Sequence, residues 1–166
     1  NAGKSSALNA ICARTGLART SKTPGRTQAI NFFTSDCLQF ADLPGYGFAR
    51  VPPAVKAQWQ TLIEGYLSNR ETLAGVVLIM DARRPLMAFD RQLIGWGTQV
   101  GLAFHLVLTK ADKLSRNQQI KALRAVEREM PDATAQLFSA LKRLGVDEAR
   151  EAIATLANEL PAEPDL

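Results

Sequence analysis

Asn1-Ala2-Gly3-Lys4-Ser5-Ser6 matches the second half of the phosphate-loop pattern G-x-x-x-x-G-K-[ST], and this stretch decides the fold expected for the chain. In that pattern, glycines let backbone N–H groups converge on phosphate oxygens, the lysine reaches the β- and γ-phosphates, and the hydroxyl binds Mg²⁺. By itself, the stretch is equally compatible with an ordinary helix start carrying an exposed lysine. Apolar residues follow it at helical spacing, namely Ala7, Leu8, Ile11 and Cys12. They predict a helix that ends near Gly16 and whose N-terminus favours anions.

The composition is that of one ordinary globular domain. The 166 residues are 46% hydrophobic and 22% charged, which suits a folded core and excludes disorder. We therefore expect residues 1–166 to form a single domain. No apolar run approaches the roughly 20 residues of a membrane helix, and no signal peptide is recognisable. Cys12 and Cys37 match no metal or disulfide framework, which predicts two buried thiols in a reducing cytoplasm.

The net charge of +4 is concentrated in the first third of the chain. Residues 1–56 carry seven Lys or Arg against two acids, whereas the remaining residues carry 13 against 14. A basic stretch without an acid contains Arg14, Arg19, Lys22 and Arg26. This stretch is either a solvated loop or a surface for the phosphates of a nucleotide or of RNA.

Strand-like and helix-like segments alternate along the chain. Short apolar or alternating runs predict strands at 29–34, 37–41, 75–81, 103–108 and 135–138. Apolar residues at helical spacing predict helices at 55–67, 86–100, 115–130 and 147–160. The order predicts an α/β fold with a mostly parallel sheet, without an internal repeat or a second domain.

Three details refine this expectation. Ser115 and Gln118 form a capping box before one helix, and Asp147 is the expected cap of the last one. His105 lies inside an apolar strand, where it is either a satisfied core histidine or, less simply, a catalytic one. Trp59 and Tyr66 fall on the apolar face of a helix and are expected in the core rather than in a stacking platform.

Short motifs stand in a fixed order along the chain, at or near predicted strand ends or in loops. They are Gly3-Lys4-Ser5, Pro24-Gly25-Arg26-Thr27, Asp42-Leu43-Pro44-Gly45, Thr109-Lys110-Ala111-Asp112 and Phe138-Ser139-Ala140. Taken alone, Asp42 is compatible with an ordinary turn. Because ligands of open α/β sheets bind at the carboxyl ends of strands, Asp42 is predicted to meet a metal at the phosphate loop.

With these motifs, the chain resembles the EngB (YihA/YsxC) family of bacterial ribosome-biogenesis GTPases, in the TrmE-Era-EngA-EngB-Septin-like superfamily. The residues that carry the resemblance are 1–6, 22–28, Asn31-Phe32, 42–49 and 109–112. The resemblance covers essentially the whole chain and implies a P-loop G domain with helices on both faces of the sheet. The family places a strand and the first glycine of the phosphate loop before Asn1. We therefore expect an N-terminally truncated chain that lacks this central strand.

The resemblance also implies how the nucleotide phosphates are held. Lys4, Thr27 and Gly45 are the expected catalytic residues, and Ser5, Thr27 and Asp42 are the expected Mg²⁺ ligands. Thr27 and Asp42 would lie on loops that distinguish GTP from GDP, because the γ-phosphate and Mg²⁺ order such loops.

The implied base site explains a preference for guanine. Asp112 accepts two hydrogen bonds from N1–H and the exocyclic amine of guanine, a donor pair that adenine lacks, which argues against a P-loop ATPase or kinase. Lys110 covers the base plane, and the backbone of Ser139 and Ala140 meets the guanine carbonyl. The complete expected nucleotide-binding set is Asn1, Ala2, Gly3, Lys4, Ser5, Ser6, Gly25, Arg26, Thr27, Asp42, Leu43, Pro44, Gly45, Thr109, Lys110, Ala111, Asp112, Phe138, Ser139 and Ala140.

The function implied is a Mg²⁺-dependent GTP/GDP switch in assembly of the large ribosomal subunit, in a family associated with cell division and septation. Tyr46 stands where Ras-type enzymes carry the water-orienting glutamine, which predicts slow intrinsic turnover. Asn1 is a candidate K⁺ ligand or a brace for the loop. The alternative is a nucleotide-gated ribosome- or RNA-binding module with negligible hydrolysis. A monomeric cytoplasmic protein is expected in both cases, with the large subunit or its precursor as partner.

Overall fold

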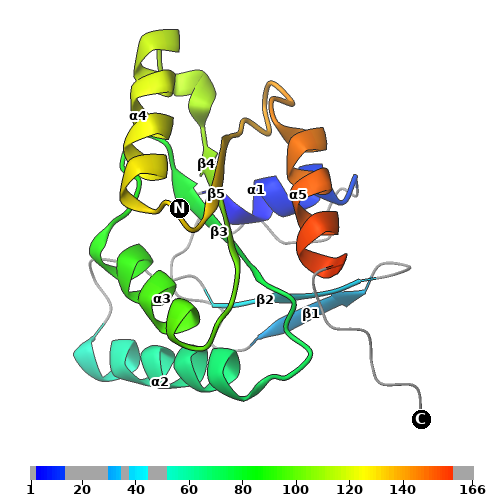
Figure 1. Ribbon diagram of the computed structural model, residues 1–166, viewed down its shortest axis with the longest axis vertical. Coiled ribbons are helices and arrows are strands. Elements are labelled where there is room, and N and C mark those ends of the chain that lie inside the picture. The colour runs from blue at the N-terminus through cyan, green and yellow to red at the C-terminus, as the bar shows by residue number, and fades with distance from the viewer. Residues whose placement is uncertain (1–2, 14–29, 35–37, 45–51, 159–166) are drawn as a thin grey trace.

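The computed structural model describes residues 3–13, 30–34, 38–44 and 52–158. Helices and strands alternate in it as the sequence predicts (Figure 1). In chain order the elements are α1 (Lys4–Ile11), β1 (Asn31–Thr34), β2 (Gln39–Asp42), α2 (Pro53–Asn69), β3 (Val76–Asp81), α3 (Ala88–Gln99), β4 (Phe104–Thr109), η1 (Ala111–Lys113, a 3₁₀ helix), α4 (Arg116–Glu129), β5 (Thr134–Leu137) and α5 (Val146–Asn158).

The strands form two sheets. β3, β4 and β5 are parallel, with Val76 opposite Phe104 and Leu106 opposite Ala135. β1 and β2 form an antiparallel pair with Asn31 opposite Asp42. Every residue of β4 is buried, as expected for the central strand of a parallel sheet covered on both faces. The carboxyl ends of β3, β4 and β5 therefore lie at one edge, where the last two predicted motifs begin, at Thr109 and Phe138.

Helices cover both faces of the parallel sheet, which confirms the predicted architecture. Leu106 and Leu108 of β4 pack on one face with α2, α3 and α4, in a core that includes Ile63 and Val126. On the opposite face, Val107 packs with α1 and α5. Figure 1 shows α1 and α5 together on one side of the sheet and α3 and α4 on the other. This alternation of buried residues is what a strand's two-residue period produces.

Several local predictions were wrong. The first helix ends at Ile11, so Gly16, which lies outside the described residues, is not its cap. The last helix begins at Val146, and Asp147 lies in its first turn with an exposed side chain. Leu62 of α2 and Ile120 of α4 belong to the apolar spacing that predicted these helices, yet they are 38% and 40% exposed. The apolar stripes are therefore narrower than the sequence periodicity suggests.

Other local predictions are confirmed or partly confirmed. Ser115 accepts from Gln118 N, and the Gln118 side chain accepts from Ser115 N, which is the expected capping box. Trp59 is buried and Tyr66 packs at the edge of the same core. Cys12 is half-buried rather than buried, and Cys37 lies outside the described residues. No helix in the described ranges has the length and apolarity needed to cross a membrane.

A cavity of about 530 Å³ lies between the two sheets. It is bordered by β2 and β3 and by residues of α1, α2 and α5, and its lining includes Phe40, Val77, Ile79 and Leu156. In the described part of the chain, β2 pairs with β1 alone and β3 with β4 alone. The cavity thus lies between two strand edges that pair with no further strand in the described part of the chain.

Candidate nucleotide site

The phosphate end of the site is the N-terminus of α1. Gly3 precedes the helix with a φ of 83°, a left-handed conformation that favours glycine, and its carbonyl accepts from Ala7 N at 2.9 Å. The first turn contains no acidic residue. It carries Lys4 and Ser5, both half-buried, and the exposed Ser6. The backbone N–H groups of such a turn attract anions, and no carboxylate of this turn competes with them.

Lys4 joins this helix to the end of β2. Its Nζ lies 2.6 Å from Asp42 Oδ1 and donates to the Leu43 carbonyl at 2.5 Å. The Asp42 side chain is only 15% exposed, and Pro44 beside it is buried. The structure therefore brings together the first and third predicted motifs, which are 39 residues apart at Lys4 and Leu43.

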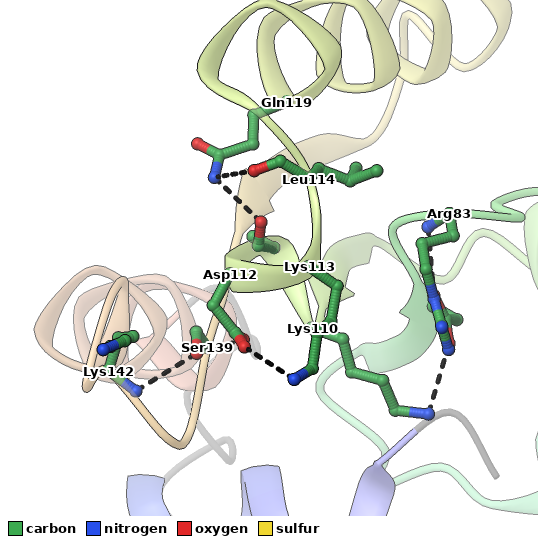
Figure 2. Close-up of polar contacts among 10 residues, drawn as sticks. Arg83, Lys110, Asp112, Lys113, Leu114, Gln119, Ser139 and Lys142 are labelled. Carbon is green, nitrogen blue, oxygen red and sulfur yellow. Dashed lines mark hydrogen bonds and ion pairs between the residues drawn. The ribbon is translucent and has the colours of Figure 1, made fainter.

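The second end of the site lies at the carboxyl ends of β4 and β5. Asp112 belongs to η1, directly after β4, and Ser139 follows β5. The Ser139 hydroxyl donates to Asp112 Oδ1 at 2.5 Å, and Lys113 Nζ lies 3.8 Å from Oδ2 (Figure 2). The hydrogen bond from Ser139 lowers the pKa of Asp112, which favours the ionised form. An ionised, oriented carboxylate is the group needed to accept from two adjacent N–H donors.

Backbone hydrogen bonds hold these two loops in register. Phe138 N donates to Leu108 O at 2.8 Å, and Ala111 N donates to Phe138 O at 3.1 Å. The Gln119 side chain from α4 donates to the carbonyls of Ala111 and Leu114 (Figure 2). Since Phe138 and Ala111 are both fully buried, the fourth and fifth motifs form one rigid unit.

The loop after β5 is a closed turn. Ser139 and Leu144 exchange two backbone hydrogen bonds of 3.0 Å, and Lys142 N donates to the Ser139 hydroxyl at 3.1 Å. Gly145 ends the turn with a φ of 74°. An added Cβ there would lie 2.6 Å from Gln136 Nε2 and would collide with the Leu137 carbonyl. Only glycine fits this position, so the turn keeps one shape.

His105 is a core histidine that contacts the same turn through Gln136. It is 4% exposed, with Nε2 2.8 Å from Gln136 Oε1 and Nδ1 2.7 Å from the Thr134 hydroxyl. Gln136 Nε2 donates to the carbonyls of Gly145 and Leu137, so its Oε1 accepts and His105 Nε2 carries the proton. Burial lowers the pKa of His105, which favours the neutral ring. This agrees with the core interpretation over the catalytic one.

Asp81 and Arg83 contact the site although neither belongs to a predicted motif. Asp81 ends β3 beside Thr109, and its carboxylate lies 3.2 Å from Lys110 Nζ. The Arg83 side chain donates to both Asp81 oxygens, at 2.9 and 2.7 Å. These hydrogen bonds hold the pKa of Asp81 far below its usual range. The available signal was an acid closing an apolar strand at the ligand-binding edge.

Gly3 connects the phosphate end to the base end. A Cβ added to it would lie 3.6 Å from Thr109 Oγ1 and 3.8 Å from Lys110 Cε. The Thr109 hydroxyl donates to Met80 O at 3.0 Å, which fixes it against β3. Lys4, Ser5, Asp42, Lys110 and Asp112 are thus arranged along one edge of the fold. The predicted site residues Asn1, Ala2, Gly25, Arg26, Thr27 and Gly45 lie outside the described residues.

Solved structures of Era bound to guanine nucleotides share this fold. Era from Aquifex aeolicus, bound to GDP and AlF₄⁻, matches with a TM-score of 0.73 and 19% identity, over 100% of this chain and 56% of that one. A structure of Era with MgGDPNP and a segment of 16S ribosomal RNA matches with a TM-score of 0.72 and 18% identity, over 100% of this chain and 55% of that one. At these identities the likeness establishes the fold.

Sequence comparison is more specific. Residues 1–110 match the family model described as 50S ribosome-binding GTPase. The probable GTP-binding protein EngB of Aromatoleum aromaticum is 50% identical, over 99% of this chain and 80% of that protein. The corresponding protein of Thiobacillus denitrificans is 54% identical, over 90% of this chain and 74% of that protein.

The α/β fold and these matches define a GTPase of the P-loop class. Both curated relatives span nearly all of the chain, at identities that leave no ambiguity about descent. The chain belongs to the EngB family of GTP-binding proteins.

Proposed function

We propose that this chain is a Mg²⁺-dependent GTP switch in assembly of the bacterial large ribosomal subunit. The proposal rests on one observation: the phosphate end and the base end of the candidate site are both formed by paired side chains, and they lie along one edge of the fold. Lys4 and Asp42 meet at the N-terminus of α1, and Asp112 is held by Ser139 beyond β4. Between them, Lys110 lies beside Gly3. A triphosphate at one end and a guanine at the other would use both.

The phosphate end suits Mg²⁺. Lys4 and Ser5 lie in the same turn of α1, and Lys4 contacts Asp42. The Ser5 hydroxyl and the Asp42 carboxylate are the kind of hard oxygen ligands that Mg²⁺ prefers. Ser5, Asp42 and, by family resemblance, Thr27 would hold the ion. When bound, it would neutralise charge on the β- and γ-phosphate oxygens. Lys4 would turn from Asp42 to those oxygens, while Leu43, Pro44 and Gly45 would approach the γ-phosphate through their backbone.

The base end suits guanine. Asp112 would accept from N1–H and the exocyclic amine, and the backbone of Ser139 and Ala140 would meet the carbonyl of the base. The depressed pKa of Asp112 supports this role, because a protonated carboxyl would lose one of the two acceptor positions. The stem of Lys110 would lie over the base plane.

Hydrolysis is proposed to be slow. Tyr46 follows the Asp42-Leu43-Pro44-Gly45 motif, and a phenol does not orient an attacking water as glutamine does in Ras-type enzymes. A partner, or K⁺ held by Asn1, would then complete the catalytic site. A hydrolysis rate that is unchanged when K⁺ replaces Na⁺ would remove the K⁺ part of this proposal.

The proposed partner is the large ribosomal subunit or its precursor, through rRNA or ribosomal proteins. The description of the matching family model supports it, as does the basic stretch of the first third of the chain. We further propose that residues 1–166 form one G domain of a monomeric, cytoplasmic protein with a part in cell division and septation, as the family resemblance implies. Charge reversal at Arg14 and Arg19 should abolish co-sedimentation with the 50S subunit. Unchanged co-sedimentation would rule out the basic stretch as the contact.

The nucleotide proposal is tested by titrating fluorescent GDP and XDP, with Mg²⁺, into the protein and into Asp112→Asn. We expect GDP binding to fall by at least a hundredfold, because in Asn one acceptor becomes an N–H donor that faces the exocyclic amine and the remaining acceptor loses its charge. XDP binding should appear, because xanthine has a carbonyl in place of that amine. Asp132→Asn is the matched control, because Asp132 is exposed and remote from the loops of the site. Equal loss in both variants, or GDP binding that survives Asp112→Asn, would contradict the proposed base site.

A further inference from the structure

The structure points to a further positioning residue. We propose that Asp81, itself fixed by Arg83, holds the Lys110 side chain extended so that its stem is ready to cover a guanine base. The inference rests on the proposed function, because it assigns the device that prepares one of the proposed base contacts. It concerns two residues, Asp81 and Arg83, that lie outside the recognised motifs.

The Asp81 carboxylate has its acceptor positions filled by two residues. Oδ1 accepts from the Arg83 backbone N at 3.0 Å and from Nε at 2.9 Å. Oδ2 accepts from Arg83 Nη2 at 2.7 Å and lies 3.2 Å from Lys110 Nζ. A carboxylate offers about four lone-pair positions. Arg83 occupies three of these positions, and the remaining one is directed to Lys110. The Lys110 ammonium is therefore attracted to one defined position on the Asp81 carboxylate.

Lys110 is constrained at both ends of its side chain. Its backbone is left-handed, with a φ of 57°, where β4 passes into η1. Its Nζ is held by Asp81, and Cε lies 3.8 Å from the position of a Cβ on Gly3. A lysine held in this way loses less rotamer freedom when a ligand packs against its stem. The Lys110 stem also passes beside Gly3, at the end of the phosphate loop. The contact with Asp81 therefore orders the lysine next to both the base end and the phosphate end of the site.

Burial separates this arrangement from an ordinary surface ion pair. The Asp81 side chain is 19% exposed and that of Lys110 is 32% exposed, whereas exposed pairs contribute little. Asp81 is also the last residue of β3, in register with Thr109. Two neighbouring parallel strands therefore set the separation between the carboxylate and the lysine.

The test is a double-mutant cycle with Asp81→Asn and Lys110→Met, read as the dissociation rate of fluorescent GDP in stopped flow. Asn keeps the size of the side chain and removes its charge, and Met keeps an unbranched stem and removes the ammonium. We expect Asp81→Asn to speed GDP dissociation about fivefold, which is less than a fully buried hydrogen bond to a charged group would give, because the pair is partly exposed. In the Lys110→Met background, the same change should have no further effect.

The control and the contrary outcomes are distinct. Arg84→Ala, at the exposed neighbour of Arg83, should leave dissociation unchanged. A general defect of β3 would speed dissociation by the same factor in both backgrounds and would overturn the inference, as would an unchanged rate in Asp81→Asn. In steady-state hydrolysis, Asp81→Asn should raise KM for GTP and leave kcat unchanged. If Lys110→Met itself leaves GDP dissociation unchanged, the proposed base contact of Lys110 falls together with the inference. If only the Asp81 effect is missing, the proposed function stands.

Discussion

The Ser139 hydroxyl donates a 2.5 Å hydrogen bond to Asp112 Oδ1, although the two residues are 27 positions apart in the chain. Ser139 is fully buried and its oxygen also accepts from Lys142 N. One hydroxyl therefore closes its own turn and orients the carboxylate of the neighbouring loop. The loops after β4 and β5 are linked through side chains as well as through the backbone.

Ser139→Ala should weaken GDP binding about tenfold, because a hydrogen bond to a charged group is lost while the backbone of the turn is retained. Ser139→Ala should also raise the pKa of Asp112 toward its ordinary value, since this hydrogen bond is the main cause of its depression. Calorimetric titration with GDP measures the first effect. Thr155→Ala, which removes an exposed hydroxyl on α5, is the control, and equal affinities in the two variants would contradict the role of Ser139.

Stability should decrease as the pH falls below the ordinary histidine value of 6.5, because burial lowers the pKa of His105 in the folded state. The unfolded chain then binds a proton that the folded one does not, so the loss begins near pH 6.5 and ends below the folded pKa. His105 is the only histidine in the sequence. His105→Gln should therefore flatten a plot of Tm between pH 7.5 and pH 5.5, and an unchanged slope would show that other groups cause it.

The carboxylates with lowered pKa values should affect stability in a separate and more acidic pH range. The pKa values of Asp81, Asp112 and Glu129 are all lowered, in each case chiefly by a side-chain hydrogen bond. Their stabilisation is present above the unfolded values near 4 and is lost as the pH falls through the folded ones. Denaturant titrations at pH 5 and pH 3 should show this second loss in His105→Gln as well. Its absence there would mean that the carboxylate contacts contribute little.

Gly145→Ala should destabilise the protein by about 3 kcal/mol, because it combines a left-handed backbone with a clash against the Leu137 carbonyl. Gly101→Ala is the matched control. Gly101 has a similar φ of 76°, but nothing lies within 4 Å of an added Cβ, so only about 1 kcal/mol is expected. Urea unfolding measures both, and equal costs would show that the turn moves to accommodate the methyl group.

Arg150→Ala should loosen α1 and with it the phosphate end of the site. Arg150 of α5 donates from Nε to Ile11 O at 2.8 Å and from Nη2 to Ala10 O at 3.3 Å, at the C-terminus of α1. Losing these contacts should cost about 1 kcal/mol and speed hydrogen exchange in α1 more than in α4. Asp147→Ala removes the exposed partner of the same arginine and should leave exchange in α1 unchanged. Uniform exchange changes along the chain would contradict a local role.

The sequence predicts the architecture well because the buried strands are continuous runs of apolar residues. Val76–Asp81 and Phe104–Thr109 are runs that only a buried parallel strand explains, and both form where expected. Helix ends are less predictable. α1 ends at Ile11, with its last carbonyls held by Arg150 of α5, a contact more than a hundred residues away that no local pattern contains.

The motifs locate the candidate site, but they do not include the residues that hold the site's side chains and turns in place. Lys4 and Asp42, and Asp112 and Ser139, are brought together as their positions at helix and strand ends predict. Asp81 was recognisable only as an acid at the end of a strand, because its role depends on the register of β3 against β4. Gln136 was not recognisable at all, since its partners are main-chain carbonyls of a turn.

The cavity between the sheets has a consequence for how the protein behaves at high concentration. β3 has the composition of an interior strand, Val-Val-Leu-Ile-Met, yet in the described part of the chain one of its two edges has no strand beside it. Unpaired N–H and C=O groups along an apolar strand are a template on which another extended chain can add. An extended segment that pairs with this edge would therefore protect the protein from self-association.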